Sequence, residues 1–188
     1  ANDKKDAYEE PTIKRSRSHN YVSKEVINVR ENVGFIEVAN FSKHQFKGKD
    51  ARKFLDHIMA GKLPNPGRIS LSPMLSYRGK LCGDLTVSCL DENEFMVFGS
   101  GAAQEMHRRW FESHLDKFNV EYKNRSDEFH GISIAGPNSR KVLEKIVRDD
   151  VSNEKFRFRD SRRMFVGGVP AIINRISFTG ELGYEIYV

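Results

Sequence analysis

Residues 44–59 read HQFKGKDARKFLDHIM, and residues 132–147 read ISIAGPNSRKVLEKIV. The two stretches align 88 positions apart, and Gly48/Gly136, Arg52/Arg140, Lys53/Lys141, Leu55/Leu143 and Ile58/Ile146 are identical pairs. Each copy has the pattern of a short strand, a glycine turn, an Asx residue suited to capping a helix, and an amphipathic helix. Because only two copies are present, the repeat predicts two related lobes instead of a solenoid.

The rest of the sequence favours an α+β fold with mixed or antiparallel sheets and flanking helices. Alternating or continuous apolar runs predict strands, and apolar residues at helical spacing predict helices. We expect helices over residues 23–32, 50–59, 102–118 and 139–147. We expect strands over residues 35–38, 44–46, 68–71, 72–75, 81–89, 95–98, 120–122, 132–134 and 184–188, and a hairpin over 164–176 that turns at Gly167-Gly168.

These elements divide the chain into three parts. Residues 1–22 lack apolar periodicity and are interpreted as a linker or strap. Residues 23–128 and 129–188 hold one copy of the repeat each and form the two predicted lobes. The last residues lie within a strand pattern, so we expect the second lobe to be truncated and the chain to be a piece of a longer protein.

Composition narrows the classes of function. Lys and Arg number 31 against 26 Asp and Glu, a net charge of +5, but the charges are scattered without interleaved aromatics. A small anionic ligand is therefore favoured over nucleic acid. No apolar run approaches the length of a membrane span, so no membrane partner is expected. Cys82 and Cys89 are interpreted as free thiols, consistent with the bacterial cytoplasm or the mitochondrial matrix.

The glycine-rich turn and the histidines are weaker candidates for a functional site than the carboxylates described below. Residues 99–104 read GSGAAQ after a strand, as in a dinucleotide site, but Gln104 stands where the third glycine belongs. None of the six histidines has zinc-ligand spacing, so no metal is expected.

Two carboxylates stand out because apolar or aromatic residues surround them. Asp84 lies on the polar face of an otherwise apolar strand, where it could act as a general base, orient an amine, or simply be a solvated strand residue. Glu185 lies within residues 183–187 (GYEIY), where aromatic residues flank it, and could accept two parallel hydrogen bonds from a flat heterocycle. Glu181 is a turn or cap partner in the simplest interpretation.

A resemblance joins these residues to a known family. Residues 175–185 (RISFTGELGYE) resemble the R-x-S/G-Y-T-G-E-x-G-Y/W-E signature of the glycine-cleavage aminomethyltransferase family. Residues 72–75 with 79–87 are similar to that family's M-L-N…G…D-x-T/I-V hairpin. Residues 98–110, 131–137 and 150–158 are similar to the carboxy-terminal half of dimethylglycine and sarcosine dehydrogenases.

The resemblance implies the first two lobes of a tetrahydrofolate-binding domain. By position, Asp84 is the implied catalytic residue and Glu185 the carboxylate that grips the pterin ring. The other implied folate-binding residues are Phe98, Leu75, Phe178, Tyr184 and Arg175. Three residues depart from the family pattern: Phe178 replaces Tyr, Ser76 replaces Asn, and Glu37 stands where Asp is common.

The implied reaction is capture of a one-carbon unit from an oxidised N-methyl amino acid of the dimethylglycine or sarcosine type, giving 5,10-methylenetetrahydrofolate. FAD would then belong to an amino-terminal part outside this sequence, and the 188 residues alone are expected to be inactive. The partners would be folate and the N-methyl amino acid, and the sequence does not indicate an oligomeric state. A free-standing aminomethyltransferase or demethylase and a non-catalytic relative remain open alternatives.

Overall fold

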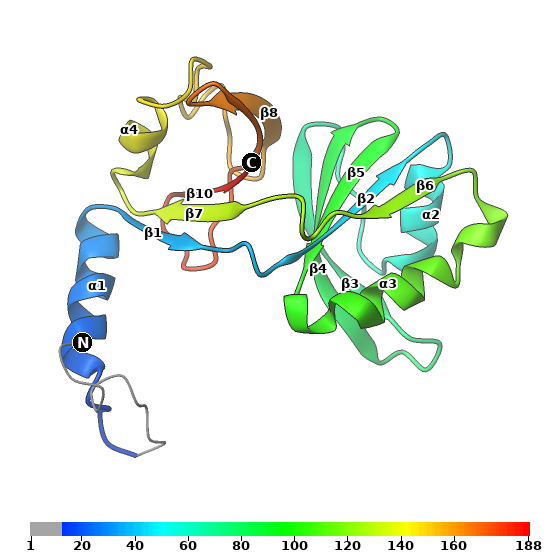
Figure 1. Ribbon diagram of the computed structural model, residues 1–188, viewed down its shortest axis with the longest axis horizontal. Coiled ribbons are helices and arrows are strands. Elements are labelled where there is room, and N and C mark those ends of the chain that lie inside the picture. Colours follow the sequence, from blue (N-terminus) through cyan, green and yellow to red (C-terminus); the bar gives the residue numbers. More distant parts are fainter. Residues whose placement is uncertain (1–12) are drawn as a thin grey trace.

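Two five-stranded antiparallel sheets form the framework of the computed structural model, which describes residues 13–188 (Figure 1). The β5 sheet has the order β3-β4-β5-β2-β6, with the bounds Arg68–Leu75, Leu81–Asp91, Glu94–Gly99, Ser42–Lys47 and Glu121–Asn124. The β10 sheet has the order β1-β7-β10-β9-β8, with the bounds Gly34–Glu37, Gly131–Ala135, Gly183–Tyr187, Val169–Asn174 and Ser161–Val166. The predicted α+β class is confirmed, and all strand pairs are antiparallel.

Helices cover the outer side of the β5 sheet (Figure 1). The helix α2 (Ala51–Ile58) buries Ala51, Phe54, Leu55 and Ile58 against Phe46, Leu85, Val87 and other residues of that sheet. Burying an apolar side chain of this size stabilises a fold by about 1.5–3 kcal/mol. The remaining helices are α1 (His19–Glu31), α3 (Gln104–Glu112), α4 (Ser139–Leu143) and the 3₁₀ turns Gly101–Ala103 and Leu115–Lys117.

The internal repeat is confirmed down to single side chains. Gly48 and Gly136 both have positive φ, +131° and +123°, where a β-carbon would meet a backbone oxygen at 2.6 and 2.4 Å. Arg52 donates to the carbonyl of Pro64, and Arg140 donates to the carbonyl of Val151. A hydrogen bond from the repeated arginine therefore connects each helix to the segment that follows it.

The two sheets meet through a small apolar cluster. Met96 and Phe98 of the β5 sheet pack with Ile172 and Tyr187 of the β10 sheet. Polar contacts surround this cluster: the Ser88 hydroxyl donates to Asn174 Oδ1 at 3.2 Å, and Arg68 forms an ion pair with the buried Asp160. These contacts fix the spacing between the two sheets, and therefore the shape of the space between them.

Several predicted boundaries were wrong. The helix predicted over residues 102–118 is interrupted after Glu112, because the carbonyl of Trp110 accepts from Ser113 Oγ at 2.8 Å and from His114 Nδ1 at 2.7 Å. Such side-chain bonds compete with the helical ladder. The predicted helix over 139–147 ends at Leu143, and the two predicted strands over 68–75 form one strand.

The helix caps also differ from the prediction. Asp50 and Asn138 occupy the N-cap positions, yet neither side chain makes a capping hydrogen bond. Asp50 Oδ2 instead accepts from the backbone N–H of Asn119 at 2.9 Å. The Asx residues therefore mark the helix starts without the contact that usually explains their preference.

The segment predicted as a linker, residues 1–22, includes the start of a helix in the structure. Residues 1–12 of the linker lie outside the described residues, and α1 begins at His19, within the predicted linker. The strand β1 pairs with β7 in the β10 sheet. The boundary between lobes at residues 128 and 129 stays a prediction. Among the described residues, no helix is long and apolar enough to cross a membrane.

Candidate functional site

A hollow of about 510 Å³ between the two sheets brings four of the predicted site residues together. These are Asp84, Phe98, Phe178 and Glu185. Asp84 and Phe98 come from strands of the β5 sheet, whereas Phe178 and Glu185 come from the loop before β10 and from β10 itself. Phe41, Leu71, Thr86, Gly99, Ser100, Ile176 and Ser177 complete the lining.

Glu185 is the most desolvated carboxylate of this hollow. It lies on β10, opposite Asn174 of β9 and Ser133 of β7. Burial raises the pKa of its carboxyl, and a hydrogen bond from the Tyr187 hydroxyl to Oε2 at 2.9 Å opposes that rise. A ligand that donates N–H groups to this carboxylate would stabilise its ionised form.

A stacked aromatic pair lies beside Glu185, and one of its rings, Phe98, lines the hollow. Phe98 of β5 and Tyr187 of β10 are stacked with ring centroids 4.4 Å apart. Tyr187 is 1% exposed, and burial raises the pKa of its phenol well above the usual value. The hydroxyl therefore remains protonated and can only donate to Glu185 while that carboxyl is ionised.

Asp84 faces the hollow from the other sheet. It lies on β4 opposite Pro73 and is exposed, whereas Leu85, Val87 and Cys89 alternate with it into the helix-side core. The predicted alternation of this strand is thus confirmed from Leu85 onward. A carboxylate on an exposed strand face can take or deliver a proton at a bound ligand.

Phe178 and Leu75 are both exposed, and of the two Phe178 borders the hollow. Phe178 is fully exposed in the loop that precedes β10, although it borders the hollow. Leu75 ends β3 with 38% exposure and does not line the hollow.

Arg175 and Tyr184 point away from the hollow. Tyr184 follows the strand alternation into the core of the β10 sheet, where it is fully buried and stacked on Phe156 at 5.8 Å. Arg175 is 8% exposed and donates to the carbonyl of Phe156 and, at 2.7 Å, to Asn153 Oδ1. Burial lowers the pKa of Arg175. Both residues support the segment beneath the hollow instead of lining it.

The sequence interpretation did not single out Tyr187. Its position two residues after Glu185 places both side chains on the same face of β10, so strand alternation was the signal that could have found it. Leu71 was also missed, and its 62% exposure shows an apolar side chain turned toward open space.

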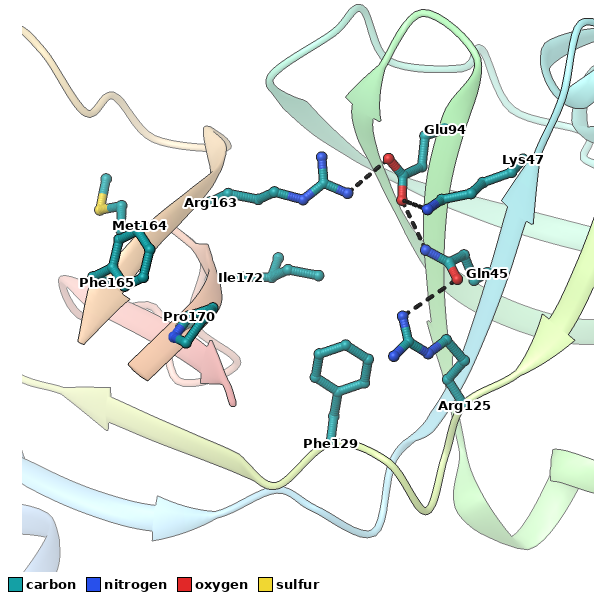
Figure 2. Close-up of a pocket in the computed structure, with 11 residues that line it drawn as sticks. Gln45, Lys47, Glu94, Arg125, Phe129, Arg163, Met164, Phe165, Pro170 and Ile172 are labelled. Atoms are coloured by element: carbon teal, nitrogen blue, oxygen red, sulfur yellow. Dashed lines mark hydrogen bonds and ion pairs between the residues drawn. The ribbon is translucent and has the colours of Figure 1, made fainter. Parts of the chain in front are cut away.

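A second hollow, of about 330 Å³, lies elsewhere between the sheets and is dominated by an ion-pair cluster (Figure 2). Arg163 of β8 and Lys47 of β2 reach Glu94 of β5 at 2.7 and 3.1 Å. Burial opposes ionisation of Glu94, but hydrogen bonds from Arg163 and Lys47 hold its pKa below the usual value. Because Glu94 already partners both cations, this cluster is better explained as a polar bridge between sheets than as an anion site.

The glycine-rich turn does not form a dinucleotide site. β5 lies between β4 and β2 in an antiparallel sheet, whereas the fingerprint requires a strand of a doubly wound parallel sheet. A β-carbon on Gly101 would lie 1.9 Å from the carbonyl oxygen of Asn40, so the glycine is explained by close backbone packing. Among residues 13–188, no three His, Cys, Asp or Glu side chains gather as metal ligands.

Comparison with known proteins assigns the chain to a family. The chain belongs to the family described as the GCVT N-terminal domain, whose model matches residues 4–188. The mitochondrial dimethylglycine dehydrogenase of Mus musculus is 36% identical over 180 residues, covering 94% of this chain and 21% of that protein. An aminomethyltransferase of Thermosipho melanesiensis is 32% identical over 168 residues, covering 88% of this chain and 46% of that protein.

Solved structures show the same fold. The glycine cleavage system aminomethyltransferase T from Bartonella henselae matches with a TM-score of 0.77 at 21% identity, covering 88% of this chain and 44% of that one. The heterotetrameric sarcosine oxidase from Corynebacterium sp. U-96 matches with a TM-score of 0.64 at 17% identity, covering 94% of this chain and 87% of that one. This chain spans 21% of the dimethylglycine dehydrogenase and 46% of the aminomethyltransferase, less than half of either curated relative. Both of these relatives are enzymes by name.

Proposed function

We propose that this chain is the tetrahydrofolate-binding part of an enzyme that captures a one-carbon unit from an oxidised N-methyl amino acid. The product would be 5,10-methylenetetrahydrofolate. The observation that carries the proposal is the pairing of a desolvated carboxylate, Glu185, with an opposing carboxylate, Asp84, across one hollow with aromatic walls. The relationship to proteins named dimethylglycine dehydrogenase and aminomethyltransferase supports the same reaction class.

The residues present suit a pterin ring. A pterin offers adjacent N–H donors on a flat edge, and Glu185 has a carboxylate with one protein donor, Tyr187, and room for others. Phe98 and Phe178 offer aromatic surface beside it. When bound, tetrahydrofolate would supply the amine nitrogens that take up the one-carbon unit.

Asp84 would act on the other side of the bound ring. In the proposal its carboxylate orients the reacting amine and accepts or returns a proton there. Apolar residues of the lining, Leu71, Phe41 and Ile176, would limit water around the reacting centre. The described residues do not fit a dinucleotide flavin, so oxidation of the amino acid is assigned to another part of the full-length protein.

Asp84→Asn in the full-length protein tests the assigned chemistry. The rate of one-carbon transfer to tetrahydrofolate should fall by roughly 10²–10⁴-fold. The affinity for tetrahydrofolate should stay near the wild-type value, because Glu185 would hold the pterin. Asp91→Asn is a matched control, since it makes the same charge change on the exposed far end of β4. Wild-type turnover in Asp84→Asn would remove Asp84 from the mechanism.

A further inference from the structure

His107 lies on α3, on the opposite side of the β5 sheet from the hollow, and is 2% exposed. Its Nε2 is 3.2 Å from the carbonyl oxygen of Cys82, two residues before Asp84. Because a carbonyl can only accept, Nε2 carries the proton and donates to it. Burial lowers the pKa of His107, which keeps the imidazole neutral and its tautomer fixed by this bond.

Cys82 lies at an irregularity in the β4 strand. Leu75 of β3 pairs with Leu81, while Met74 pairs with Gly83, so Cys82 is an extra residue in β4. An extra residue of this kind is a β-bulge, which breaks the ladder locally and redirects the side chains that follow. Cys82 has no opposite residue in β3, and its carbonyl accepts a hydrogen bond from His107.

Within residues 13–188, the strand that carries Asp84 has one neighbouring strand at this point. The β4–β5 pairing runs from Asp91 only as far as Thr86, whereas β3 pairs with β4 through Asp84. The residues of β4 from Leu81 to Asp84 therefore have no strand pairing with β5. His107 of α3 contacts this segment instead, through its hydrogen bond to Cys82.

Two glycines leave room for the imidazole. A β-carbon on Gly83 would lie 2.8 Å from His107 Nε2, and one on Gly99 would lie 3.1 Å from its Cε1 and Nδ1. The ring thus occupies the volume that side chains on β4 and β5 would otherwise fill. The three residues form a close-packed unit directly behind Asp84.

We propose that His107 is a positioning residue: its hydrogen bond to Cys82 and its packing on Gly83 and Gly99 set the β4 bulge and so aim Asp84 into the hollow. This inference rests on the proposed function for its catalytic readout. It assigns His107 no contact with the ligand, because the residue lies behind the sheet.

The test compares two substitutions in the full-length protein. His107→Met fills the space without a donor, whereas His107→Gln places an amide N–H near the position of Nε2. We expect His107→Met to lower folate-coupled turnover by roughly 10- to 100-fold, because small misplacement of a reacting group has effects of this size. Tetrahydrofolate affinity should change less than about threefold, because Glu185 lies on the other sheet. His107→Gln should recover most of the turnover, and His57→Met on the exposed face of α2 is the control.

A readout without turnover separates this inference from the proposed function. Backbone amides of residues 83–85 should exchange with deuterium faster in His107→Met than in His107→Gln, because only the first loses the bond to Cys82. Equal turnover in wild type and His107→Met, or equal losses in both variants, would overturn the positioning role. If the wild-type protein neither binds folate nor turns over, the proposed function fails, and the exchange measurement alone decides whether His107 orders the bulge.

Discussion

Tyr187→Phe removes one hydroxyl from the candidate site and little else. The Tyr187 ring is 1% exposed and stacked on Phe98, and phenylalanine preserves both the volume and the stack. What is lost is the hydrogen bond to Glu185 Oε2 at 2.9 Å. A hydrogen bond to a charged group is worth about 1.5–3 kcal/mol, and losing it makes the ionised form of Glu185, which the pterin requires, less stable. We therefore expect tetrahydrofolate to bind roughly tenfold more weakly, which corresponds to about 1.4 kcal/mol.

The same substitution changes the dependence of binding on pH. Burial already raises the pKa of Glu185, and removing the Tyr187 donor raises it further. Since a pterin with N–H donors requires the ionised carboxylate, affinity should begin to fall at a higher pH in the variant as pH is lowered. Calorimetric titrations across a pH series measure both effects. Tyr122→Phe is the control, because its hydroxyl bonds His44 at 2.9 Å on the helix side of the β5 sheet. Unchanged affinity and pH dependence in Tyr187→Phe would refute the role of Glu185.

Two further predictions concern the framework. Ion pairing holds the pKa of the folded Glu94 carboxyl below its value in the unfolded chain, near 4.5. The ion pairs therefore stabilise the fold above pH 4.5, and their contribution is lost as the pH falls through the folded-state pKa of Glu94. Glu94→Gln should lower the free energy of unfolding at pH 7 by about 1 kcal/mol, a small effect because Arg163 and Lys47 are about half exposed. The variant should also lose less stability than the wild type as the pH is lowered. Urea denaturation at several pH values measures both effects. Equal acid sensitivity in the variant would contradict this. Gly136→Ala should cost about 2–4 kcal/mol, because φ is +123° and the new methyl meets Val29 O at 2.4 Å. Gly79→Ala, with positive φ but open space around it, should cost only about 1–2 kcal/mol, and equal losses would contradict the steric argument.

The repeat and the strand alternation were sufficient to predict the main layers of the fold. Gly48 and Gly136 were detectable because the same turn, with the same positive φ, occurs twice. The interruption of the helix after Glu112 was not predictable from the apolar stripe, because it depends on Ser113 and His114 bonding back to Trp110. Hydrophobic periodicity does not reveal where polar side chains compete with the helix for backbone hydrogen bonds.

The candidate site was predictable in part for a similar reason. Asp84 and Glu185 were found as carboxylates among apolar neighbours, and the fold brings both to one hollow. Arg175 and Tyr184 belong to the same signature stretch, but strand alternation and the loop contacts direct them into the core of the β10 sheet. Proximity in a motif does not fix the direction of a side chain. His107 had no sequence signal, because its role depends on a bulge in another element.

The most direct test of the proposed pterin site is a calorimetric titration of the full-length protein with tetrahydrofolate, performed on the wild type and on Glu185→Ala. We expect saturable binding in the wild type and loss of most of that affinity in the variant, because the carboxylate that accepts from the pterin N–H groups is gone. Wild-type affinity in Glu185→Ala would place the ligand elsewhere. Absence of binding in the wild type would contradict the proposed function while leaving the fold and the family assignment intact.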